Sequence, residues 1–240
     1  MITIIDYQMG NVSSVYNALH AIGREVKVSS SIEDMRNAHH LILPGVGAFV
    51  EGMNNLKHLG LIEPLYEEVM VKKKPFLGIC LGMQLLARDG YEGGYYQGLG
   101  WLPATVKRLG LATTHGALRL PHMGWNEVTV TPGSILFEGI QQDFSFYFVH
   151  SYHLVSDDPS LIEATCEYGT TLTAAIRKDN IFATQFHPEK SHGNGLQLLR
   201  NFTTYGVTEK STHDTIPVTQ IIRNAMSDDR LFGKRAHERC

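Results

Sequence analysis

The chain has 240 residues and a formal net charge of -3 at pH 7, with 43% hydrophobic and 19% charged residues. A chain of this length can bury a substantial core, and its composition is ordinary for a globular protein. The charge leaves no basic footprint for nucleic acid, and no apolar run approaches the roughly 18 residues of a membrane span, so neither partner is expected.

The amino-terminal segment and the cysteines together indicate a cytoplasmic protein. The segment Met1-Ile2-Thr3-Ile4-Ile5 begins like a strand and lacks the charged-then-apolar order of a secretory leader. Cys80, Cys166 and Cys240 are widely separated, which fits neither a disulfide framework nor a zinc site. We therefore expect a reducing cytoplasmic setting, which keeps a thiol reactive, with no metal and no organic cofactor.

In the first 90 residues, short apolar runs alternate with segments of helical spacing. Strands are predicted at 2–5, 26–28, 41–43 and 76–79, and helices at 12–22, from about 31, at 49–56 and at 64–71. This alternation favours a parallel, doubly wound sheet with helices on both faces. Ligands of such sheets bind beyond the carboxyl ends of the strands, where Cys80 and the segment Pro44-Gly45-Val46-Gly47 fall.

The second half of the chain has a different pattern. Residues 90–100 are rich in glycine and tyrosine and are interpreted as a surface excursion. Short β-like runs follow at 125–130, 144–149 and 162–166, then a hairpin of 174–177 with 181–186 and a closing helix near 196–202. The predicted fold is α/β, a single doubly wound domain (1–206) whose central sheet is mostly parallel, with antiparallel strands in the second half. A tail follows at 207–240, which is disordered or forms a short helix at about 218–226.

The stretch Gly78-Ile79-Cys80-Leu81-Gly82 has the strand–turn–helix form of a nucleophile elbow. Such a turn strains the backbone of the nucleophile and brings strand and helix close, so side chains at Gly78 and Gly82 would collide. The turn leaves the sulfur exposed beside a helix N-terminus, whose partial positive charge favours the thiolate. A small buried cysteine on a core strand is the alternative for this motif alone.

The second strand of the predicted hairpin leads into His187-Pro188-Glu189. Residues two apart in extended chain project to the same side, so Glu189 can accept a hydrogen bond from one imidazole nitrogen while the other faces a nucleophile. This is the logic of a nucleophile–base–orienter triad. Alone, the motif is more typical of a surface turn, but its combination with Cys80 favours a catalytic triad.

The segment from Gly78 to Gln84, together with His187-Pro188-Glu189, resembles the class I (triad) glutamine amidotransferases. Three further segments are similar to the glutaminase subunits of imidazole glycerol phosphate synthases within that family. These segments are Pro44-Gly45-Val46-Gly47, Pro121-His122-Met123-Gly124-Trp125-Asn126 and Tyr147-Phe148-Val149-His150-Ser151-Tyr152. The resemblance runs from residue 1 to about 203, and Gln8 departs from it because the family pattern has glycine there.

The resemblance implies that glutamine is hydrolysed to glutamate and ammonia, with the ammonia passing unreleased to a (β/α)8 cyclase partner. The two subunits would form a heterodimer that makes imidazole glycerol phosphate and the purine-pathway carboxamide AICAR in histidine biosynthesis. Cys80 is the implied nucleophile, His187 its general base and acid, and Glu189 the residue that orients His187.

The resemblance also implies roles for residues around the triad. The oxyanion hole would use the backbone N–H of Leu81 and an N–H of Val46 or Gly47. Because Val46 is flanked by glycines, we expect its peptide to switch between a donor and a non-donor state, and this switch would keep the lone subunit nearly idle. Glutamine would be bound by Gln84, His150, Ser151 and Tyr152, and the partner would face Asn11, Trp125 and Lys190.

Three alternatives stay open. A paralogous glutaminase subunit that supplies ammonia to an amidino-sugar synthase for surface polysaccharide would have nearly the same sequence. A non-catalytic protein that keeps the fold is disfavoured because Cys80, His187 and Glu189 are all present. A cysteine peptidase or esterase on the same elbow does not account for the Pro121 to Asn126 segment.

Overall fold

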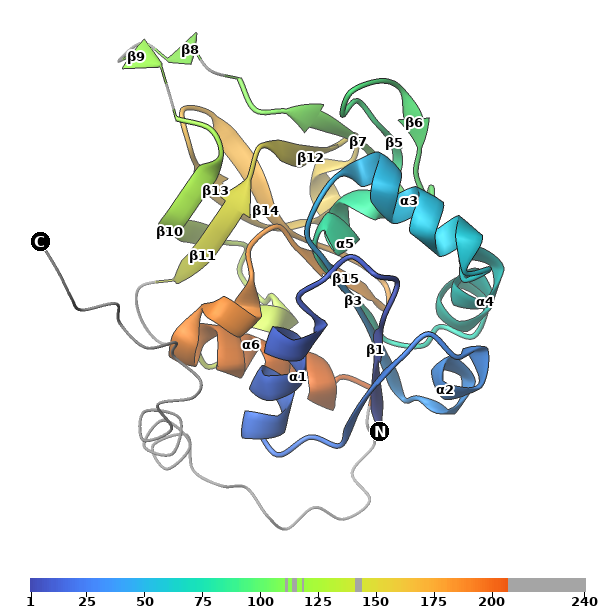
Figure 1. Ribbon diagram of the computed structural model, residues 1–240. Helices are drawn as coiled ribbons and strands as arrows, with labels where there is room; N and C mark the ends of the chain where they lie inside the picture. Colours follow the sequence, from blue (N-terminus) through green and yellow to red (C-terminus); the bar gives the residue numbers. More distant parts are fainter. Residues whose placement is uncertain (111, 114–115, 118, 141–143, 207–240) are drawn as a thin grey trace, which may run out of the picture.

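The computed structural model describes residues 1–110, 112–113, 116–117, 119–140 and 144–206 (Figure 1). The predicted tail, residues 207–240 with its short helix, lies outside the described residues. Among the helices of the described ranges, none is long and apolar enough to cross a membrane.

A nine-stranded mixed sheet forms the centre of the molecule. Its parallel part has the order β15-β4-β3-β1-β2, so that β4 pairs with β3 on one side and β15 on the other. These strands are β1 (Ile2–Ile5), β2 (Val26–Ser29), β3 (His40–Gly45), β4 (Phe76–Cys80) and β15 (Ile181–Thr184).

The same sheet continues beyond β15 with antiparallel strands in the order β14-β13-β10-β11. They are β10 (His122–Val130), β11 (Ser145–His150), β13 (Ile162–Glu167) and β14 (Thr171–Lys178). Strands β14 and β15 form the predicted hairpin, whose turn holds Asp179 at a positive φ of 54°. The predicted α/β class, with a parallel half and an antiparallel half, is therefore confirmed.

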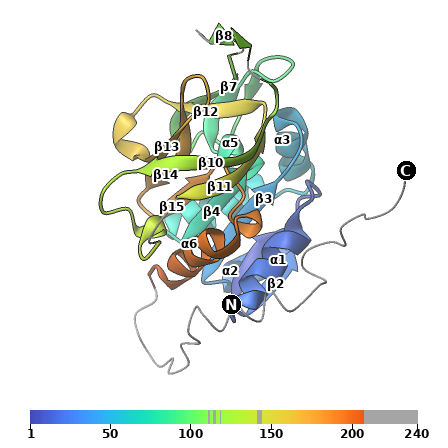
Figure 2. The ribbon, with the colours of Figure 1, turned by 90° about the vertical axis from the view of Figure 1, so that its left-hand side faces the viewer.

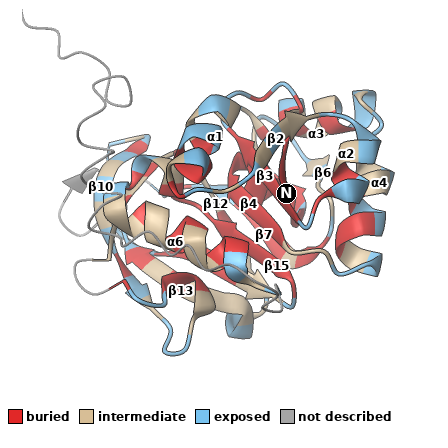
Figure 3. Cartoon of the chain, turned by 90° about the horizontal axis from the view of Figure 1, so that it is seen from below, coloured by how far each residue is buried: buried red, intermediate tan, exposed pale blue. Residues whose placement is uncertain are grey.

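Helices cover both faces of the parallel half because its strands are apolar on both sides. Helices α1 (Val12–Ala21) and α6 (His192–Thr204) lie side by side on one face (Figures 1 and 2). The other face carries α2 (Ile32–Asn37), α3 (Phe49–His58), α4 (Ile62–Tyr66) with a π-helical turn (Glu67–Val71), and α5 (Leu81–Leu85). In β1, for example, Ile4 packs with the α1 side and Ile5 with the α3 side. Figure 3 shows the strands between these layers as the buried part of the molecule.

A second sheet of four strands packs against the α5 side and was not predicted as a separate layer. Its order is β12-β7-β5-β6, with β5 (Ala87–Gly90), β6 (Tyr96–Gln97), β7 (Leu102–Arg108) and β12 (Tyr152–Ser156). The stretch 90–100, predicted as a plain surface excursion, in fact adds β6 to this sheet by pairing with β5. A two-stranded hairpin of β8 (Ala112–Thr113) and β9 (Gly116–Ala117) and single 3-10 turns at Ile135–Phe137, Pro159–Leu161 and Pro188–Lys190 complete the described elements.

Candidate active site

Cys80 ends β4 and directly precedes α5, as the elbow motif predicts. Its backbone has φ 53° and ψ −104°, a conformation that L-residues rarely adopt and that persists only where the surrounding structure imposes it. A Cβ at Gly78 would lie 2.8 Å from the carbonyl oxygen of Gly82, and one at Gly82 would overlap the carbonyl oxygen of Leu43. Both glycines are therefore required by the close approach of strand and helix.

His187 and Glu189 meet as predicted, at the turn that follows β15. The Nδ1 atom of His187 lies 2.7 Å from Oε1 of Glu189, and both side chains are fully buried. Burial alone would lower the pKa of His187, but the neighbouring negative charges of Cys80 and Glu189 outweigh it and raise that pKa to about 10. The Nε2 atom of His187 is buried without a hydrogen-bond partner among the described residues, which leaves it available to the Cys80 sulfur and a substrate.

Asn11, which the sequence places at the partner surface, reaches the triad itself. Its side-chain amide donates a hydrogen bond to Oε1 of Glu189, and its Nδ2 lies 3.5 Å from Nδ1 of His187. Asn11 precedes α1 with φ 64°, in the left-handed region that asparagine tolerates better than most residues. The contact joins the loop after β1 to the carboxylate that is paired with His187.

The loop after β1 also contacts Val46, which the sequence predicts as part of an oxyanion hole. The N–H of Val46 donates to the carbonyl oxygen of Met9 (3.0 Å), so it points away from Cys80 in this structure. Gly47 follows with a positive φ of 110°, and Val46 and Gly47 both line the pocket in front of Cys80. The Leu81 residue, whose N–H is the other predicted donor, begins α5 and lines the same pocket.

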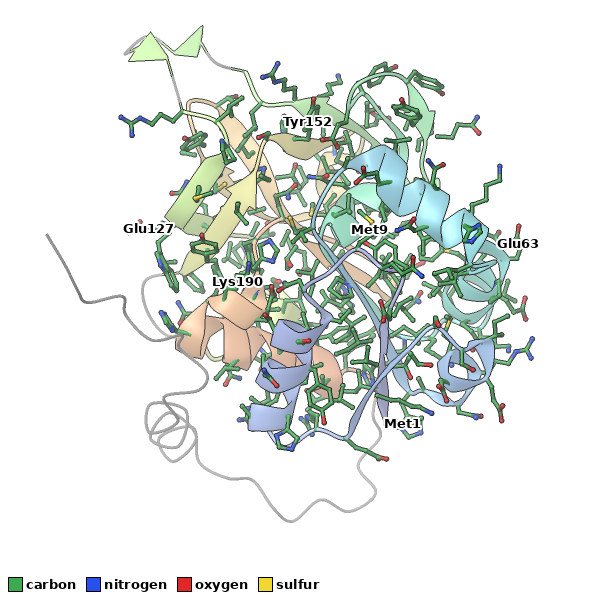
Figure 4. The ribbon with its side chains drawn as sticks, in the orientation of Figure 1. Met1, Met9, Glu63, Glu127, Tyr152 and Lys190 are labelled. Carbon is green, nitrogen blue, oxygen red and sulfur yellow. The ribbon has the colours of Figure 1, made fainter. Side chains whose placement is uncertain are left out.

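A pocket of about 400 Å³ opens over Cys80 between the end of the parallel strands and the second sheet. It contains every predicted glutamine-binding residue together with Lys190. Its lining is Val46, Gly47, Cys80, Leu81, Gln84, Glu92, Pro121, Val149, His150, Ser151, Tyr152 and Lys190. Figure 4 labels Met9, Tyr152 and Lys190, which come from three segments distant in the sequence. Of these, Tyr152 and Lys190 line the pocket.

The pocket wall from His150 to Tyr152 is fixed by a buried chain of hydrogen bonds. Nδ1 of His150 lies 2.9 Å from the Tyr152 carbonyl, which only accepts, so that nitrogen carries the proton. Nε2 of His150 then accepts from Nδ1 of His122 at 3.0 Å, and Nε2 of His122 from the Asn126 amide at 3.3 Å. Burial lowers the pKa of His122 to about 4 and that of His150 to about 3, so both rings are neutral at pH 7.

Glu92 is a pocket residue that the sequence reasoning missed. It follows β5, and its Oε2 accepts a hydrogen bond from the backbone N–H of Phe49 at 2.7 Å, which anchors the side chain at the pocket. The surrounding glycines and tyrosines indicated only a surface excursion. A lone acidic residue in such a stretch carries no signal that would distinguish it from a solvated charge.

A group of side chains at the edge of the pocket includes the predicted partner residues Trp125 and Lys190, the second of which also lines the pocket. The Trp125 ring is 48% exposed, stacks on His192 at 4.9 Å and meets Tyr147 edge-on at 6.2 Å. The Lys190 ammonium lies 5.9 Å from the centre of the Tyr147 ring. Met123, two residues before Trp125 on β10, is 61% exposed. Exposed large side chains gathered beside a pocket are typical of an interaction surface.

Comparison with known proteins places these features in one family. A family model described as glutamine amidotransferase class-I matches residues 3–204. An imidazole glycerol phosphate synthase subunit HisH from Campylobacter jejuni is 48% identical over 202 residues, which cover 84% of this chain and 98% of that protein. HisH proteins of Pseudomonas aeruginosa and Rhodopirellula baltica are each 46% identical and cover 84% and 85% of this chain, with 98% and 97% of their own length.

Solved structures agree on the fold. The crystal structure of a glutamine amidotransferase superposes with a TM-score of 0.63 at 22% identity and covers 84% of this chain and 96% of its own. The PurLQS structure from Thermotoga maritima gives a TM-score of 0.62 at 16% identity, with 85% and 97% covered. At these identities the likeness concerns the fold alone.

Proposed function

The chain belongs to the class I glutamine amidotransferase family, as a subunit of the HisH type, and from this membership we propose that Cys80, His187 and Glu189 carry out its glutaminase reaction. The enzyme is the glutamine-hydrolysing subunit of an imidazole glycerol phosphate synthase, in histidine biosynthesis. The observation that carries the assignment of the triad is the strained Cys80 elbow beside the paired His187 and Glu189, close enough for the charge of Cys80 to raise the pKa of His187. The curated relatives are named for the histidine pathway, which does not favour the amidino-sugar alternative.

In the proposed mechanism, the Cys80 thiolate attacks the side-chain amide carbon of glutamine. The raised pKa of His187 means that this ring is protonated at pH 7 and can give its proton from Nε2 to the leaving ammonia. The neutral ring then takes a proton from water, which hydrolyses the thioester to glutamate. Glu189 holds Nδ1 of His187 and supports the positive charge, and Asn11 fixes that carboxylate in turn.

We further propose that the N–H of Leu81 and the N–H of Val46 bind the oxyanion. In the present structure Val46 donates to Met9 instead, so one of the two donors is withheld. A flip of the Val46 peptide would supply it. Loss of one oxyanion donor costs on the order of a hundredfold or more in rate, which is sufficient to keep the lone subunit nearly idle.

The proposed partner is a (β/α)8 cyclase subunit that receives the ammonia in a heterodimer. The exposed Met123 and Trp125, with Lys190 and Tyr147 beside them, support this surface because aromatic and methionine side chains are enriched in interfaces. The β1–α1 loop contacts Val46 through Met9 and Glu189 through Asn11. A partner that moves this loop would therefore act on the oxyanion hole and on the triad at once.

Glu92 is expected to hold the α-ammonium group of glutamine, because it is an anchored carboxylate in the pocket near Gln84. We expect Glu92→Gln to raise KM for glutamine by about tenfold to a hundredfold while kcat changes little, because one charge-assisted hydrogen bond becomes neutral. Steady-state kinetics with the partner present measure both constants. An unchanged KM would exclude Glu92 from substrate binding, and Glu63→Gln, an exposed carboxylate on α4 at the outer side of the molecule (Figure 4), is the matched control.

The function is tested by measuring glutamine hydrolysis by the purified chain with and without a cyclase subunit and its nucleotide substrate or product. Partner and ligand together are expected to raise the rate on the order of a hundredfold, as the missing oxyanion donor is supplied. Equal rates with and without the partner would contradict the oxyanion switch. Glutamine hydrolysis at a rate that does not change when this partner is added would indicate another acceptor pathway. The absence of hydrolysis under any condition would reject the glutaminase assignment.

A further inference from the structure

Gln185 lies directly beside the Cys80 sulfur, and the proposed mechanism gives it no role. Its side chain is fully buried, two residues before His187 at the end of β15. Its Nε2 lies 3.6 Å from Sγ of Cys80, within the range of an N–H bond to sulfur. The sulfur also lies 4.0 Å from the Val149 carbonyl oxygen, which accepts from a thiol but repels a thiolate.

The orientation of the Gln185 amide is set by its other end. Oε1 of Gln185 accepts from Nε2 of Gln84 at 3.1 Å, and a second N–H on the same Gln84 nitrogen donates to the Tyr152 carbonyl at 2.8 Å. Because the amide nitrogen of Gln84 can only donate, Gln185 must present its oxygen to Gln84 and its nitrogen to Cys80. The sulfur therefore faces a donor whose direction is fixed by two further hydrogen bonds.

We propose that Gln185 is a further catalytic residue, whose side-chain N–H stabilises the Cys80 thiolate and remains with it as the thioester forms and breaks. The proposal rests on the proposed role of Cys80 as the nucleophile. A neutral donor suits this place because it offsets the repulsion of the Val149 carbonyl without adding a charge that would compete with His187 for the sulfur.

The arrangement also connects the substrate pocket to the nucleophile. Gln84 lines the pocket and holds both the Tyr152 carbonyl of the pocket wall and the Gln185 amide behind the sulfur. A substrate that engages Gln84 is thus two hydrogen bonds from Sγ of Cys80. The side-chain amides of Gln84 and Gln185 each have a fixed orientation. A substrate that contacts Gln84 therefore also affects how the Gln185 N–H is held against the Cys80 sulfur.

Two substitutions at Gln185 distinguish the loss of the N–H donor from a change in side-chain packing. Gln185→Met keeps the volume and removes the N–H, whereas Gln185→Glu keeps the shape and the acceptor for Gln84 but turns an oxygen toward the sulfur. The matched controls are Gln197→Met and Gln197→Glu on α6, where the glutamine amide donates a hydrogen bond to Oδ1 of Asn201 at 2.9 Å. Circular dichroism and urea denaturation establish that each variant is folded, so that Gln185→Met remains informative if Gln185→Glu fails to fold.

The readout is alkylation of Cys80 by iodoacetamide, followed by mass spectrometry of the Cys80 peptide in the full chain. At pH 7 we expect Gln185→Met to react about tenfold more slowly than the wild type, and Gln185→Glu more slowly still. His187 and Tyr7, the other titratable groups beside Cys80, and Lys190 and Glu92 in the pocket are the same in all variants.

With the cyclase partner present, the same variants are expected to lose about tenfold or more in kcat with little change in KM, whereas the Gln197 variants match the wild type. Wild-type alkylation at pH 7 by a folded Gln185→Met would overturn the proposal. Alkylation requires neither glutamine nor partner. It therefore decides the role of Gln185 even if the wild type proves to hydrolyse no glutamine, which would instead reject the proposed function.

Discussion

Cys80→Ala is expected to lower the rate of glutamine hydrolysis by about ten-thousandfold or more, even with the partner present. The reason is that Cys80 is the only thiol among the described residues that line the pocket and the only one of them in the strained elbow; the other polar side chains there are one amide, a carboxylate, an ammonium, two hydroxyls and a neutral imidazole. Ammonia release in a coupled assay measures the loss. Residual activity above about one thousandth of the wild-type rate would show that the thioester route is wrong.

The same variant has a second, spectroscopic consequence. The Cys80 thiolate is the larger of the two charges that raise the pKa of His187. Its removal should therefore bring that pKa down from about 10, so that the ring titrates at lower pH in Cys80→Ala. Histidine NMR titration of the wild type and the variant compares the two. Identical curves would mean that the sulfur and the imidazole do not interact, whatever the effect on catalysis.

Gly82→Ala is expected to destabilise the domain by at least about 3 kcal/mol, a large fraction of the stability of a typical domain. An added Cβ would overlap the carbonyl oxygen of Leu43, which belongs to the backbone of β3 and cannot rotate away. Relief requires α5 to move away from the sheet, which also moves the N–H of Leu81 from its place beside Cys80. Urea denaturation and the glutaminase assay should therefore both report a severe loss.

The matched control for this substitution is Gly193→Ala on α6. Nothing lies within 4 Å of a Cβ at Gly193, and its backbone is not in the left-handed region. The change is expected to alter the free energy of unfolding by less than about 1 kcal/mol, in the stabilising direction, because alanine favours a helix. If Gly82→Ala were as stable as Gly193→Ala, the close approach of β3 and α5 would be wrong.

The fold was predictable where the hydrophobic period and the turn residues agree. The apolar runs at 2–5, 41–43 and 76–79 became the central parallel strands, and the hairpin around Asp179 was confirmed. The second sheet was not predictable in the same way. Its β6 strand has only two residues, Tyr96 and Gln97, and it exists because β5 offers a free edge, which no local pattern in the sequence reveals.

The residues of the site also fall into a group that could be predicted from the sequence and a group that could not. Cys80, His187 and Glu189 stand in motifs whose spacing is itself geometric, so their meeting could be foreseen. The contacts of Asn11 with Glu189 and of Gln185 with Cys80 depend on how loops from opposite ends of the chain close over the sheet. The direction of the Val46 N–H depends on how the single peptide unit between Gly45 and Val46 is oriented, and glycine permits both orientations.

The position of β4 in the sheet has a consequence for how the protein is made. The ribosome completes β4 and β3 early, whereas β15, the other neighbour of β4, follows about a hundred residues later. At synthesis rates of about 5–20 residues per second, this edge of β4 stays without its partner for roughly five to twenty seconds. During this time the nascent chain exposes unpaired N–H and C=O groups at a strand edge, which invites wrong pairing. The delay also means that a growing chain carries Cys80 before His187 and Glu189 have been made.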